Sequence, residues 1–440
     1  MNYYKLLQAQ AVAYGNKPFL CMDARVFSYA SFLSNVDALA EELEDFHIRG
    51  DVIIYSEDFI EEASLFFALQ RIGARPLAAH AGVMDSLARR PTENIAGILT
   101  MRQGEVSWSP RDTTENVSSP EGCMGVFTSG STGAPKVLYR TYASWAAFFP
   151  VQNAAFRIGE ESRLYLHGSL GFTGNLNVFL AVLYRGATLV TTAAFQPKQV
   201  YHLLSESGVD VVYLVPNKLR LLVQAKEAPI QGIQSVFTGS QLLSEELLQS
   251  LRRSFPAAHI FLYYGASELN YITYRELEGE GFDERNLGRP FENVKLEVRD
   301  SLIYVTTPYR VSNVKCPFAL GDLGTLDEKG NLRLLGRRSD VVNKGGYKIS
   351  LAALKEKLEK MQGVEAAEVL GYEDSRRYEE AAAFLVLERS VERGPIEKRI
   401  RKELPAVERP KKLFYLNEIP INDRGKADKE RLRSYIFNGS

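Results

Sequence analysis

Between residues 163 and 264, short apolar runs typical of strands alternate with stretches whose apolar residues have helical spacing. Short β-branched or aromatic runs predict strands, and stretches with apolar residues at helical spacing predict the helices between them. The predicted strands are RLYLH, ATLVT, VDVVYLV, QSVFTG and HIFLYY, and the predicted helices lie near residues 175–184, 197–205, 217–225 and 244–253. This alternation favours an α/β fold with a doubly wound, mostly parallel sheet, which binds ligands beyond the carboxyl ends of its strands.

The same alternation is present near the amino terminus. RVFSY and VIIY predict strands, and a helical stretch follows each of them. The apolar faces of these two helices consist of Phe32, Val36, Leu39 and Leu43, and of Phe59, Ala63, Phe66 and Leu69. The polar stretch 103–122 predicts a loop or an irregular hairpin.

The pattern changes after residue 288. Short strands and turns there predict a β-rich subdomain, and from about residue 339 a charged helix precedes two strands, a helix, a strand and a final helix. This last part has the size of an independently folding α+β module. We therefore expect a large amino-terminal domain, residues 1–338, and a small carboxy-terminal domain, residues 339–440.

The amino-acid composition limits which binding partners and which cellular compartment are expected. Hydrophobic residues make up 45% and charged residues 24%, with a net charge of −1, which is the balance of a globular protein without affinity for nucleic acid. Cys21, Cys123 and Cys316 are too dispersed for a disulfide framework or a zinc site, which favours a reducing cytoplasm. No apolar run approaches the roughly 18 residues of a membrane span. We expect small-molecule or protein partners.

One segment, Thr128-Ser-Gly-Ser-Thr-Gly-Ala-Pro-Lys136, packs hydroxyl side chains and glycines between two apolar runs. Glycines let backbone N–H groups face an anion, and hydroxyls and a lysine add further donors. A nucleotide-binding P-loop needs Gly-Lys-Ser/Thr at the start of a helix, whereas Ala-Pro precedes Lys136 here and a strand-like run follows. The residues alone leave two readings, a hairpin loop or an anion-binding turn.

This segment closely resembles the signature loop of the adenylate-forming superfamily, which includes acyl-CoA synthetases, peptide-synthetase adenylation domains and luciferases. Four further elements resemble that family in the same order: Tyr264-Gly-Ala-Ser-Glu268, Gly321-Asp-Leu323, Gly336-Arg337 with Gly345-Gly-Tyr-Lys-Ile349, and Asn422-Asp-Arg-Gly-Lys426. Five elements in order identify the chain as a member, most like an acyl-CoA synthetase.

The resemblance implies roles for named residues. It places ATP or AMP on Thr128, Ser129, Gly130, Ser131, Thr132, Gly133, Gly239, Ser240, Tyr264, Gly265, Ser267, Asp322 and Arg337. In this set Tyr264 would stack on adenine and Asp322 would accept hydrogen bonds from the ribose. By themselves, Tyr264 fits the core equally well, and Asp322 lies in a turn-like context where aspartate is common.

The resemblance also implies the catalytic groups, namely Lys426, Glu268 and Lys136. Glu268 would hold Mg²⁺ against the phosphates, and Lys426 would bridge the substrate carboxylate and the α-phosphate. Gly345 and Gly346 would line the tunnel of the attacking thiol. Three features depart from the family: Ser339 stands at the hinge position, the residues after Ile349 read Ser-Leu-Ala-Ala-Leu, and only 127 residues precede the signature loop.

The acyl substrate is expected near LHGSLGFTGN, residues 166–175. By resemblance, His167 and Phe172 would line the acyl pocket, although a structural hydrogen bond for His167 and core packing for Phe172 are equal alternatives. No acidic residue lies between residues 166 and 176 to pair with an α-ammonium group, which argues against amino acids as substrates.

The resulting hypothesis is an acid–thiol ligase that uses ATP, Mg²⁺ and coenzyme A. It would convert a carboxylic acid to acyl-AMP and pyrophosphate, and then pass the acyl group to coenzyme A, with fatty acid metabolism as the expected setting. The alternative acceptor is the phosphopantetheine of an acyl or peptidyl carrier protein. An alternative from another class is a non-catalytic relative that only binds nucleotide or acyl ligand.

Overall fold

The computed structural model describes residues 1–89, 95–111, 122–129, 135–225, 227–278, 282–337, 341–344, 347–373, 379–389, 391–422 and 427–438. Its contacts divide the chain into two compact units. The first consists of Met1–Glu297, Tyr304–Phe318 and Leu326–Arg333, and the second of Val298–Ile303, Ala319–Thr325 and Leu334–Ser440. Among the described residues, no helix is both long enough and apolar enough to cross a membrane.

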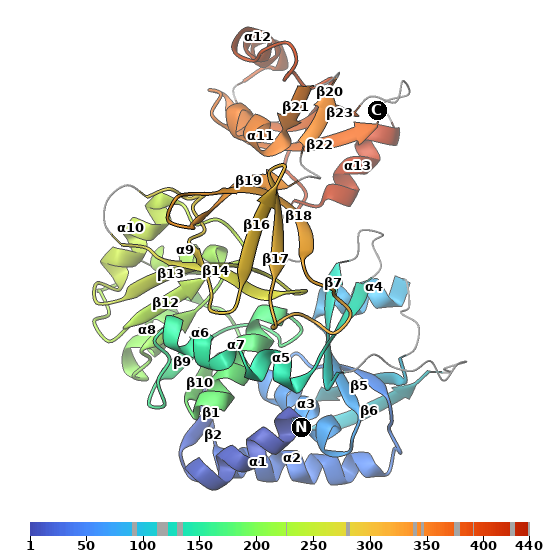
Figure 1. Cartoon of the computed structure of the whole chain (residues 1–440), viewed down its shortest axis with the longest axis vertical. Helices are drawn as coiled ribbons and strands as arrows, with labels where there is room; N and C mark the ends of the chain where they lie inside the picture. The colour runs from blue at the N-terminus through green and yellow to red at the C-terminus, as the bar shows by residue number, and fades with distance from the viewer. Residues whose placement is uncertain are drawn as a thin grey trace. The chain divides into compact units, whose positions relative to one another are not determined.

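A nine-stranded sheet dominates the first unit (Figure 1). From edge to edge it contains β15 (Arg289–Pro290), β14 (Asn270–Glu276), β13 (His259–Ala266), β12 (Ser235–Thr238), β11 (Val211–Tyr213), β9 (Arg163–Leu166), β10 (Thr188–Thr191), β1 (Pro18–Met22) and β2 (Arg25–Ser28). The strands from β13 to β1 are parallel, and the outer pairs are antiparallel. This confirms the α/β prediction. The antiparallel partner β14, which follows HIFLYY, was not predicted.

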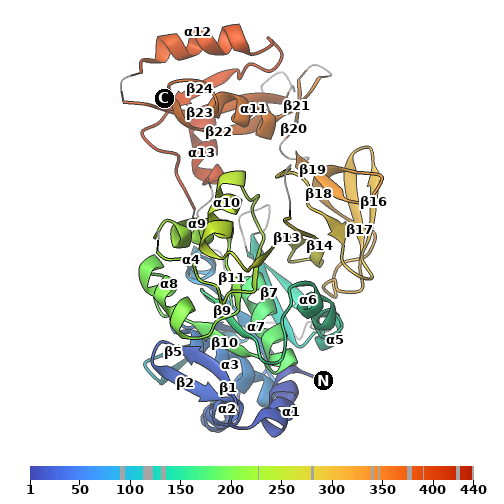
Figure 2. The same ribbon diagram turned by 90° about the vertical axis from the view of Figure 1, so that its left-hand side faces the viewer.

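Helices cover both faces of this sheet. They are α5 (Tyr142–Ala146), α6 (Phe149–Ala155), α7 (Thr173–Arg185), α8 (Pro197–Glu206), α9 (Pro216–Val223) and α10 (Glu245–Ser254). Figures 1 and 2 show α8, α9 and α10 on one side of the strands and α5, α6 and α7 on the other. Because each crossover helix leads from one parallel strand to the next, the residues after these strands gather at one edge.

A second, six-stranded sheet lies in the same unit. Its order is β6 (Glu105–Pro110), β5 (Gly97–Arg102), β3 (Asp51–Tyr55), β4 (Arg75–Ala78), β7 (Met124–Ser129) and β8 (Pro135–Arg140), with a parallel centre and antiparallel edges. Its helices are α1 (Tyr3–Tyr14), α2 (Tyr29–Glu44), α3 (Phe59–Arg71) and α4 (Ala81–Arg89). Strand β6 shows that the stretch expected as a loop or hairpin contains the second strand of a hairpin with β5.

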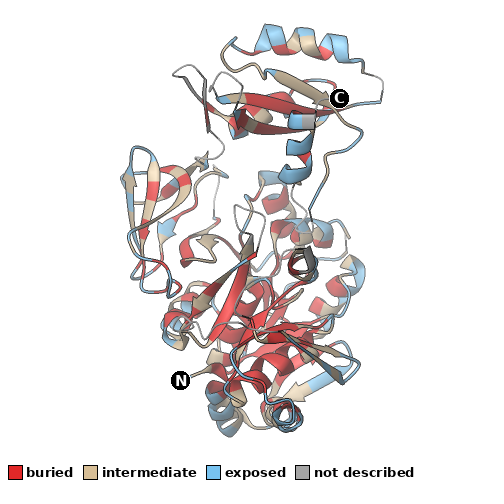
Figure 3. Cartoon of the chain, turned by 90° about the vertical axis from the view of Figure 1, so that its right-hand side faces the viewer, coloured by how far each residue is buried: buried red, intermediate tan, exposed pale blue. Residues whose placement is uncertain are grey.

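Helix α3 of the six-stranded sheet packs against helix α7 of the nine-stranded sheet. Both are buried along most of their length, and buried residues fill the interior of the first unit (Figure 3). The ring centroids of Phe59 and Phe67 lie 5.5 and 6.0 Å from that of Phe179. Burial of each such ring contributes roughly 1.5–3 kcal/mol. Asp58 caps the start of α3, because its carboxylate accepts hydrogen bonds from the N–H groups of Ile60 and Glu61. An apolar helix with a polar start thus supports the region where the site residues lie.

A four-stranded sheet, β16 (Lys295–Arg299), β17 (Leu302–Thr306), β18 (Phe318–Leu326) and β19 (Leu332–Arg337), is the predicted β-rich part. The second unit then contains β20 (Val341–Lys344), β21 (Tyr347–Ser350), α11 (Leu351–Glu359), β22 (Val364–Glu373), β23 (Glu379–Leu387), α12 (Arg393–Glu403), β24 (Lys412–Tyr415) and α13 (Lys429–Asn438). From α11 onward this is the predicted order of elements. Helices α11 and α12 share an apolar core with the three-stranded sheet β22-β23-β24.

Candidate active site

The carboxyl edge of the nine-stranded sheet brings together most of the site residues predicted in its strands and loops. Strands β9, β11, β12 and β13 are parallel neighbours, with Leu166 opposite Tyr213 and Tyr213 opposite Phe237. His167 follows β9, Gly239 and Ser240 follow β12, and residues 264–267 complete β13 and begin the turn after it. Open α/β sheets bind ligands at this edge.

The turn after β12 requires a glycine. A Cβ at residue 239 would lie 2.5 Å from the ring of Tyr263, a contact that real Cβ atoms do not make. The next residue, Ser240, has φ +67°, so the chain turns sharply as it leaves the strand. Ser240 and Gly239 were predicted as nucleotide contacts, and the fold places their backbone at the carboxyl edge.

The predicted element Tyr264–Glu268 is partly strand. Tyr264 and Gly265 lie in β13, while Ser267 and Glu268 form the turn into β14. The Ser267 hydroxyl donates a hydrogen bond to Oγ1 of Thr173, the first residue of α7, over 3.1 Å. This bond holds the turn against the start of the helix that follows the predicted acyl segment.

Arg140 supports the same turn from β8. Its guanidinium is fully buried and donates to the carbonyl oxygens of Ser267, over 2.6 Å, and Tyr309, over 2.8 Å. Burial lowers the pKa of Arg140 to about 9, and the nearby charge of Glu268 opposes that shift. This residue was not predicted from the sequence. An arginine on the same side of the strand as apolar Leu138 is the signal that could have identified it.

The predicted signature loop joins β7 to β8. Thr128 pairs with Lys136 across these antiparallel strands, and the Lys136 side chain is exposed. Gly130, Ser131, Thr132 and Gly133 lie outside the described residues, as does the side chain of Ser129. The strand predicted after Lys136 is present as β8, so the segment does not have the strand-to-helix geometry of a P-loop.

The predicted acyl segment is held by a buried carboxylate that the sequence analysis also missed. Glu62 of α3 accepts hydrogen bonds from the hydroxyl of Ser169, over 2.7 Å, and from the N–H groups of Leu170, over 2.8 Å, and Gly171, over 3.2 Å. It is 1% exposed, and burial raises its pKa to about 7. A glutamate within the otherwise apolar face of α3 is the only sequence signal for this contact.

Phe172 and His80 form the outer side of this segment. Their rings are stacked, with centroids 4.3 Å apart and planes 5° apart, and Phe172 remains 37% exposed. Core packing therefore does not explain Phe172 fully, because much of its ring faces solvent. The backbone before it is tightly placed, since a Cβ at Gly171 would lie 2.3 Å from the backbone nitrogen of His80.

His167 is paired with a lysine from the neighbouring crossover. The ammonium of Lys218 lies 2.6 Å from His167 Nδ1 and 3.0 Å from the His167 carbonyl oxygen. Burial and the lysine charge lower the pKa of His167 to about 4, and burial lowers the pKa of Lys218 to about 8. At neutral pH the imidazole is therefore neutral and accepts at Nδ1, while the lysine is the donor.

In the second unit, Arg337 and Asp322 form an ion pair. Nε of Arg337 donates to Oδ1 of Asp322 over 2.8 Å, and their side chains are 67% and 4% exposed. Asp322 was expected in a turn, and this was wrong, because it lies inside β18. The strand nevertheless bends beside it, since Gly321 has φ +82°. Gly345, Gly346 and Lys426 lie outside the described residues.

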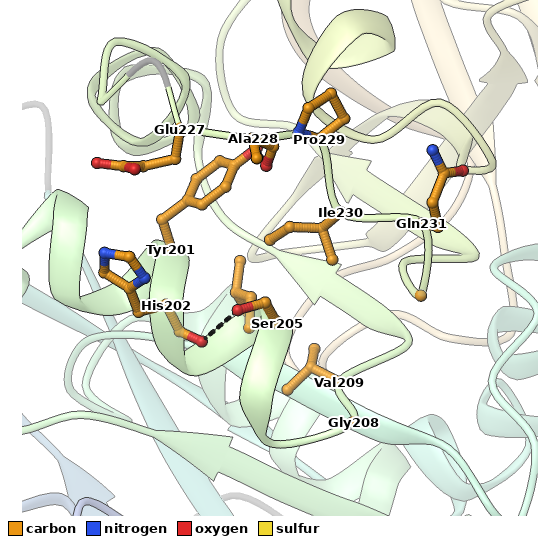
Figure 4. A pocket seen from close by; sticks show the side chains of 12 residues that line it. Tyr201, His202, Ser205, Gly208, Val209, Glu227, Ala228, Pro229, Ile230 and Gln231 are labelled. Atoms are coloured by element: carbon orange, nitrogen blue, oxygen red, sulfur yellow. Dashed lines mark hydrogen bonds between the residues drawn. The ribbon is translucent and has the colours of Figure 1, made fainter.

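A hollow of about 430 Å³ lies elsewhere on the first unit (Figure 4). Its lining comes from the end of α8 and the residues after it, which precede β11, and from residues 227–232, which precede β12. It therefore lies at the amino ends of these two strands. The hydroxyls of Tyr201 and Ser205 already donate to carbonyl oxygens of Ala228 and His202. None of the predicted site residues lines it, and the carboxyl edge remains the better site.

His259, Glu276 and Glu278 form the one group in the described residues whose ligand atoms could share a metal ion. The group lies at the start of β13 and the end of β14, whereas Glu268, the predicted metal residue, lies in the turn at the opposite end of these strands. His259 Nδ1 is within hydrogen-bond distance of the Glu276 carboxylate, and the guanidinium of Arg157 lies 3.7 Å from the same carboxylate. These contacts account for the group without a metal.

Two family models match the chain. The model of the AMP-binding enzyme family matches residues 92–307, and that of the AMP-binding enzyme C-terminal domain matches residues 355–426. Among curated proteins, an uncharacterized acyl-CoA ligase, YhfT, from Bacillus subtilis is 26% identical over 70% of this chain and 68% of its own. A putative long chain fatty acid-CoA ligase, VraA, from Staphylococcus haemolyticus is 28% identical over 71% and 70%.

Solved structures show the same fold. The O-succinylbenzoate coenzyme A synthetase MenE from Bacillus subtilis, in complex with AMP, has a TM-score of 0.82 at 21% identity and covers 97% of this chain and 98% of its own. ATP-bound MatB from Rhodopseudomonas palustris has a TM-score of 0.80 at 19% identity, with 100% of both chains covered. At these sequence identities, the similarity to the solved structures shows a shared fold and no more.

Proposed function

The chain belongs to the AMP-binding enzyme family, and from this membership we propose that it is an AMP-forming acid–thiol ligase. In the first step a carboxylate oxygen attacks the α-phosphorus of ATP, the bond to the bridging oxygen of the β-phosphate breaks, and pyrophosphate leaves. In the second step a thiol sulfur attacks the acyl carbon and AMP leaves. Coenzyme A is the proposed thiol.

The observation that carries this proposal is the meeting of the predicted elements at one edge of the nine-stranded sheet. Residues after β9, β12 and β13, which are far apart in sequence, gather at neighbouring carboxyl ends, and the Ser267–Thr173 bond connects two of these segments. The family's two domain models match in the expected order around them. A nucleotide and an acid can therefore share this edge.

We propose the following division of work between the residues. Thr128 and the backbone N–H groups of Ser240 and Ser267 donate to phosphate oxygens, and Tyr264 provides a partly exposed ring for adenine. The glycine-rich residues 130–133 would surround the phosphates. In residues 339–440, proposed as the mobile domain, Lys426 would bridge the two reacting anions and Gly345 and Gly346 would admit the thiol.

Asp322 and Arg337 are proposed as the ribose and phosphate contacts. The carboxylate of Asp322 is held by the Arg337 guanidinium, so it is a pre-oriented acceptor for ribose hydroxyls. The exposed side of the guanidinium can at the same time donate to a nucleotide oxygen.

Glu268 fits the role of the magnesium residue. Mg²⁺ is usually held by one or two carboxylates together with substrate phosphates, and Glu268 supplies one carboxylate in the turn after β13. The buried Arg140 fixes the backbone of that turn at Ser267. When bound there, Mg²⁺ would offset negative charge on the phosphates. Exposed Lys136, opposite Thr128, would add charge from the protein.

Pyrophosphate release from Mg-ATP, measured across fatty, aryl, dicarboxylic and amino acids with and without coenzyme A, tests the proposal. At least one acid should support release, and coenzyme A should yield its thioester. If ATP binds and no acid supports release, the non-catalytic alternative is correct. A pantetheinylated carrier protein in place of coenzyme A tests the alternative acceptor.

Replacement of Lys426 by alanine separates the two steps. Lys426→Ala should abolish adenylate formation, a loss of about a thousandfold or more if charge stabilisation is removed, and should leave thiolysis of supplied acyl-AMP. Lys398→Ala, an exposed lysine of α12, is the matched control and should keep both steps. Loss of both steps in a folded Lys426→Ala protein would contradict the role.

The setting of the reaction is part of the same proposal. The putative fatty acid ligase among the relatives supports fatty acids as one class to test. Three unpaired cysteines, of which Cys21 is buried, support a reducing compartment such as the cytoplasm.

A further inference from the structure

The ammonium of Lys218 occupies an unusual position beside the predicted acyl segment. It is partly buried between elements that follow β9 and β11 and lies 5.4 Å from the ring centroid of Phe195. In the part of the chain that the structure describes, it donates to His167 alone. Among the described residues, no carboxylate forms an ion pair with it. A partly buried lysine without a counter-ion is unfavourable unless a ligand supplies the negative charge.

The hydrogen bonds that Lys218 and His167 already make indicate what kind of ligand fits beside them. Lys218 has three N–H bonds and uses two of them on Nδ1 and the carbonyl oxygen of His167. Acceptance at Nδ1 places the imidazole proton on Nε2, which makes that atom a donor as well. The groups of Lys218 and His167 that are left to bind a ligand are therefore all hydrogen-bond donors.

Two neighbouring features extend this donor set. Gly168 has no side chain, and a Cβ built there would lie 3.4 Å from the Lys218 ammonium and 3.1 Å from Nδ2 of Asn175. That amide uses one N–H on the carbonyl oxygen of Ser169, which leaves its second N–H available. Helix α9 starts beside the ammonium without a side-chain cap, so its positive end adds to the same potential.

We propose that Lys218, with His167 and Asn175, forms a subsite for a second anionic or hydroxyl group on the acid that the enzyme activates. The substrate is thus a carboxylic acid with another oxygen acceptor away from the reacting carboxylate, most favourably a second carboxylate. This inference rests on the proposed ligase function and adds the substrate class. The lysine is a specificity residue, because it acts on a part of the acid that does not react.

The test uses matched acids of equal length. Pyrophosphate release by the full chain is measured with butanoate to decanoate and with the corresponding acids that end in a second carboxylate or a hydroxyl. Within the best pair, the dicarboxylic acid should have a kcat/KM at least tenfold above the unsubstituted acid. A preference for unsubstituted acids at every length would overturn the subsite.

The variant Lys218→Met removes the charge and keeps most of the side-chain volume. It should reduce the dicarboxylic preference by about tenfold to a hundredfold, the usual effect of a lost charge-assisted hydrogen bond, with KM for ATP unchanged. Lys198→Met is the matched control, because Lys198 is an exposed lysine at the start of α8, another Pro-initiated helix without a side-chain cap. It should behave as the wild type.

Two further outcomes are informative. If Lys218→Met raises KM for ATP and leaves the acid preference unchanged, the lysine binds a nucleotide phosphate and the subsite proposal is wrong. If no acid of any series supports release, the ligase function itself fails. Should Lys218→Met not fold, Lys218→Gln provides the second variant: it should lose the preference for the dicarboxylic acid and keep that for the hydroxy acid.

Discussion

Two different kinds of contact hold residues 167–172, one from each sheet of the first unit. From the six-stranded side, Glu62 accepts three hydrogen bonds and is 1% exposed. From the nine-stranded side, Lys218 holds His167 and stays partly accessible. The first contact is an acceptor facing backbone, and the second is a set of donors facing an open edge.

The Glu62 contact supports the backbone of residues 167–172, whereas the Lys218 contact is suited to bind a ligand. Glu62 already accepts hydrogen bonds from the Ser169 hydroxyl and from two backbone N–H groups of the segment, so a ligand could add little there. Lys218 and Asn175 each have an N–H group for which no described residue is an acceptor, so a ligand or water can satisfy it. Changes on the Glu62 side should therefore act on stability, and changes on the Lys218 side should act on the choice of acid.

The largest effect is expected from Gly171→Ala, in the part of the segment whose backbone is held by Glu62. The new Cβ would lie 2.3 Å from the backbone nitrogen of His80, and backbone cannot move aside cheaply. The free energy of unfolding should fall by about 3 kcal/mol, the upper range of overpacking, as measured by urea denaturation. Gly232→Ala, with no neighbour nearer than 4.0 Å, is the control and should be nearly neutral. Equal effects of both would contradict the close packing of this segment.

The next effect concerns Glu62 and pH. Its pKa is about 7 in the folded chain against an ordinary value of 4.5, so between these values the folded protein keeps a proton that the unfolded chain has lost. Stability conferred by this group therefore falls as pH rises, on the order of 2 kcal/mol between pH 5 and pH 7. Glu62→Gln should remove that slope, measured as the free energy of unfolding at several pH values.

The control for this experiment is Glu61→Gln, which replaces the adjacent, partly exposed carboxylate that accepts a hydrogen bond from the Gly104 N–H group. It should retain the wild-type slope. A Glu62→Gln protein with the same slope as the wild type would show that the carboxylate is solvated, and the contrast between the two sides of the segment would disappear.

The smallest effect extends the comparison to the second unit, where a buried acceptor, Asp322, and an exposed donor, Arg337, are again combined. Arg337→Ala should lower the free energy of unfolding by about 1 kcal/mol, because the buried carboxylate of Asp322 loses one hydrogen-bond partner while the exposed guanidinium is largely screened by solvent. It should raise KM for ATP roughly tenfold, the lower effect of a lost charge-assisted hydrogen bond. Arg333→Ala, on the same strand and paired with Asp283, should leave KM unchanged. An equal rise in both variants would argue against a nucleotide contact at Arg337.

Much of the fold could be predicted from local patterns. The strands and helices between residues 163 and 264, and the order of elements from α11 onward, agree with the prediction because alternation and helical spacing reflect one buried face of each element. The element β14 was missed, since the motif before it obscured the hairpin. Asp322 was misplaced because a Gly-Asp pair is as typical of a bent strand as of a turn.

The candidate site was predictable only where a motif marks it. Glu268 and Ser267 follow a strand in the sequence, and they lie at its end in the structure. Arg140 carries no motif, and its role depends on the carbonyl oxygen of Ser267, 127 positions away. Such a contact has no local signature, because it arises from the packing of β8 against a turn of another sheet.

The sequence by itself determined the family resemblance, the alternation of elements and which residues are proposed for nucleotide chemistry, because these are recorded in local spacing. Only the tertiary structure decided which side chains meet around residues 167–172. Glu62 lies more than a hundred positions from its partners, and Lys218 lies 51 positions from His167. Strand order and helix packing bring them together, and burial then shifts their pKa values and leaves donors facing one edge.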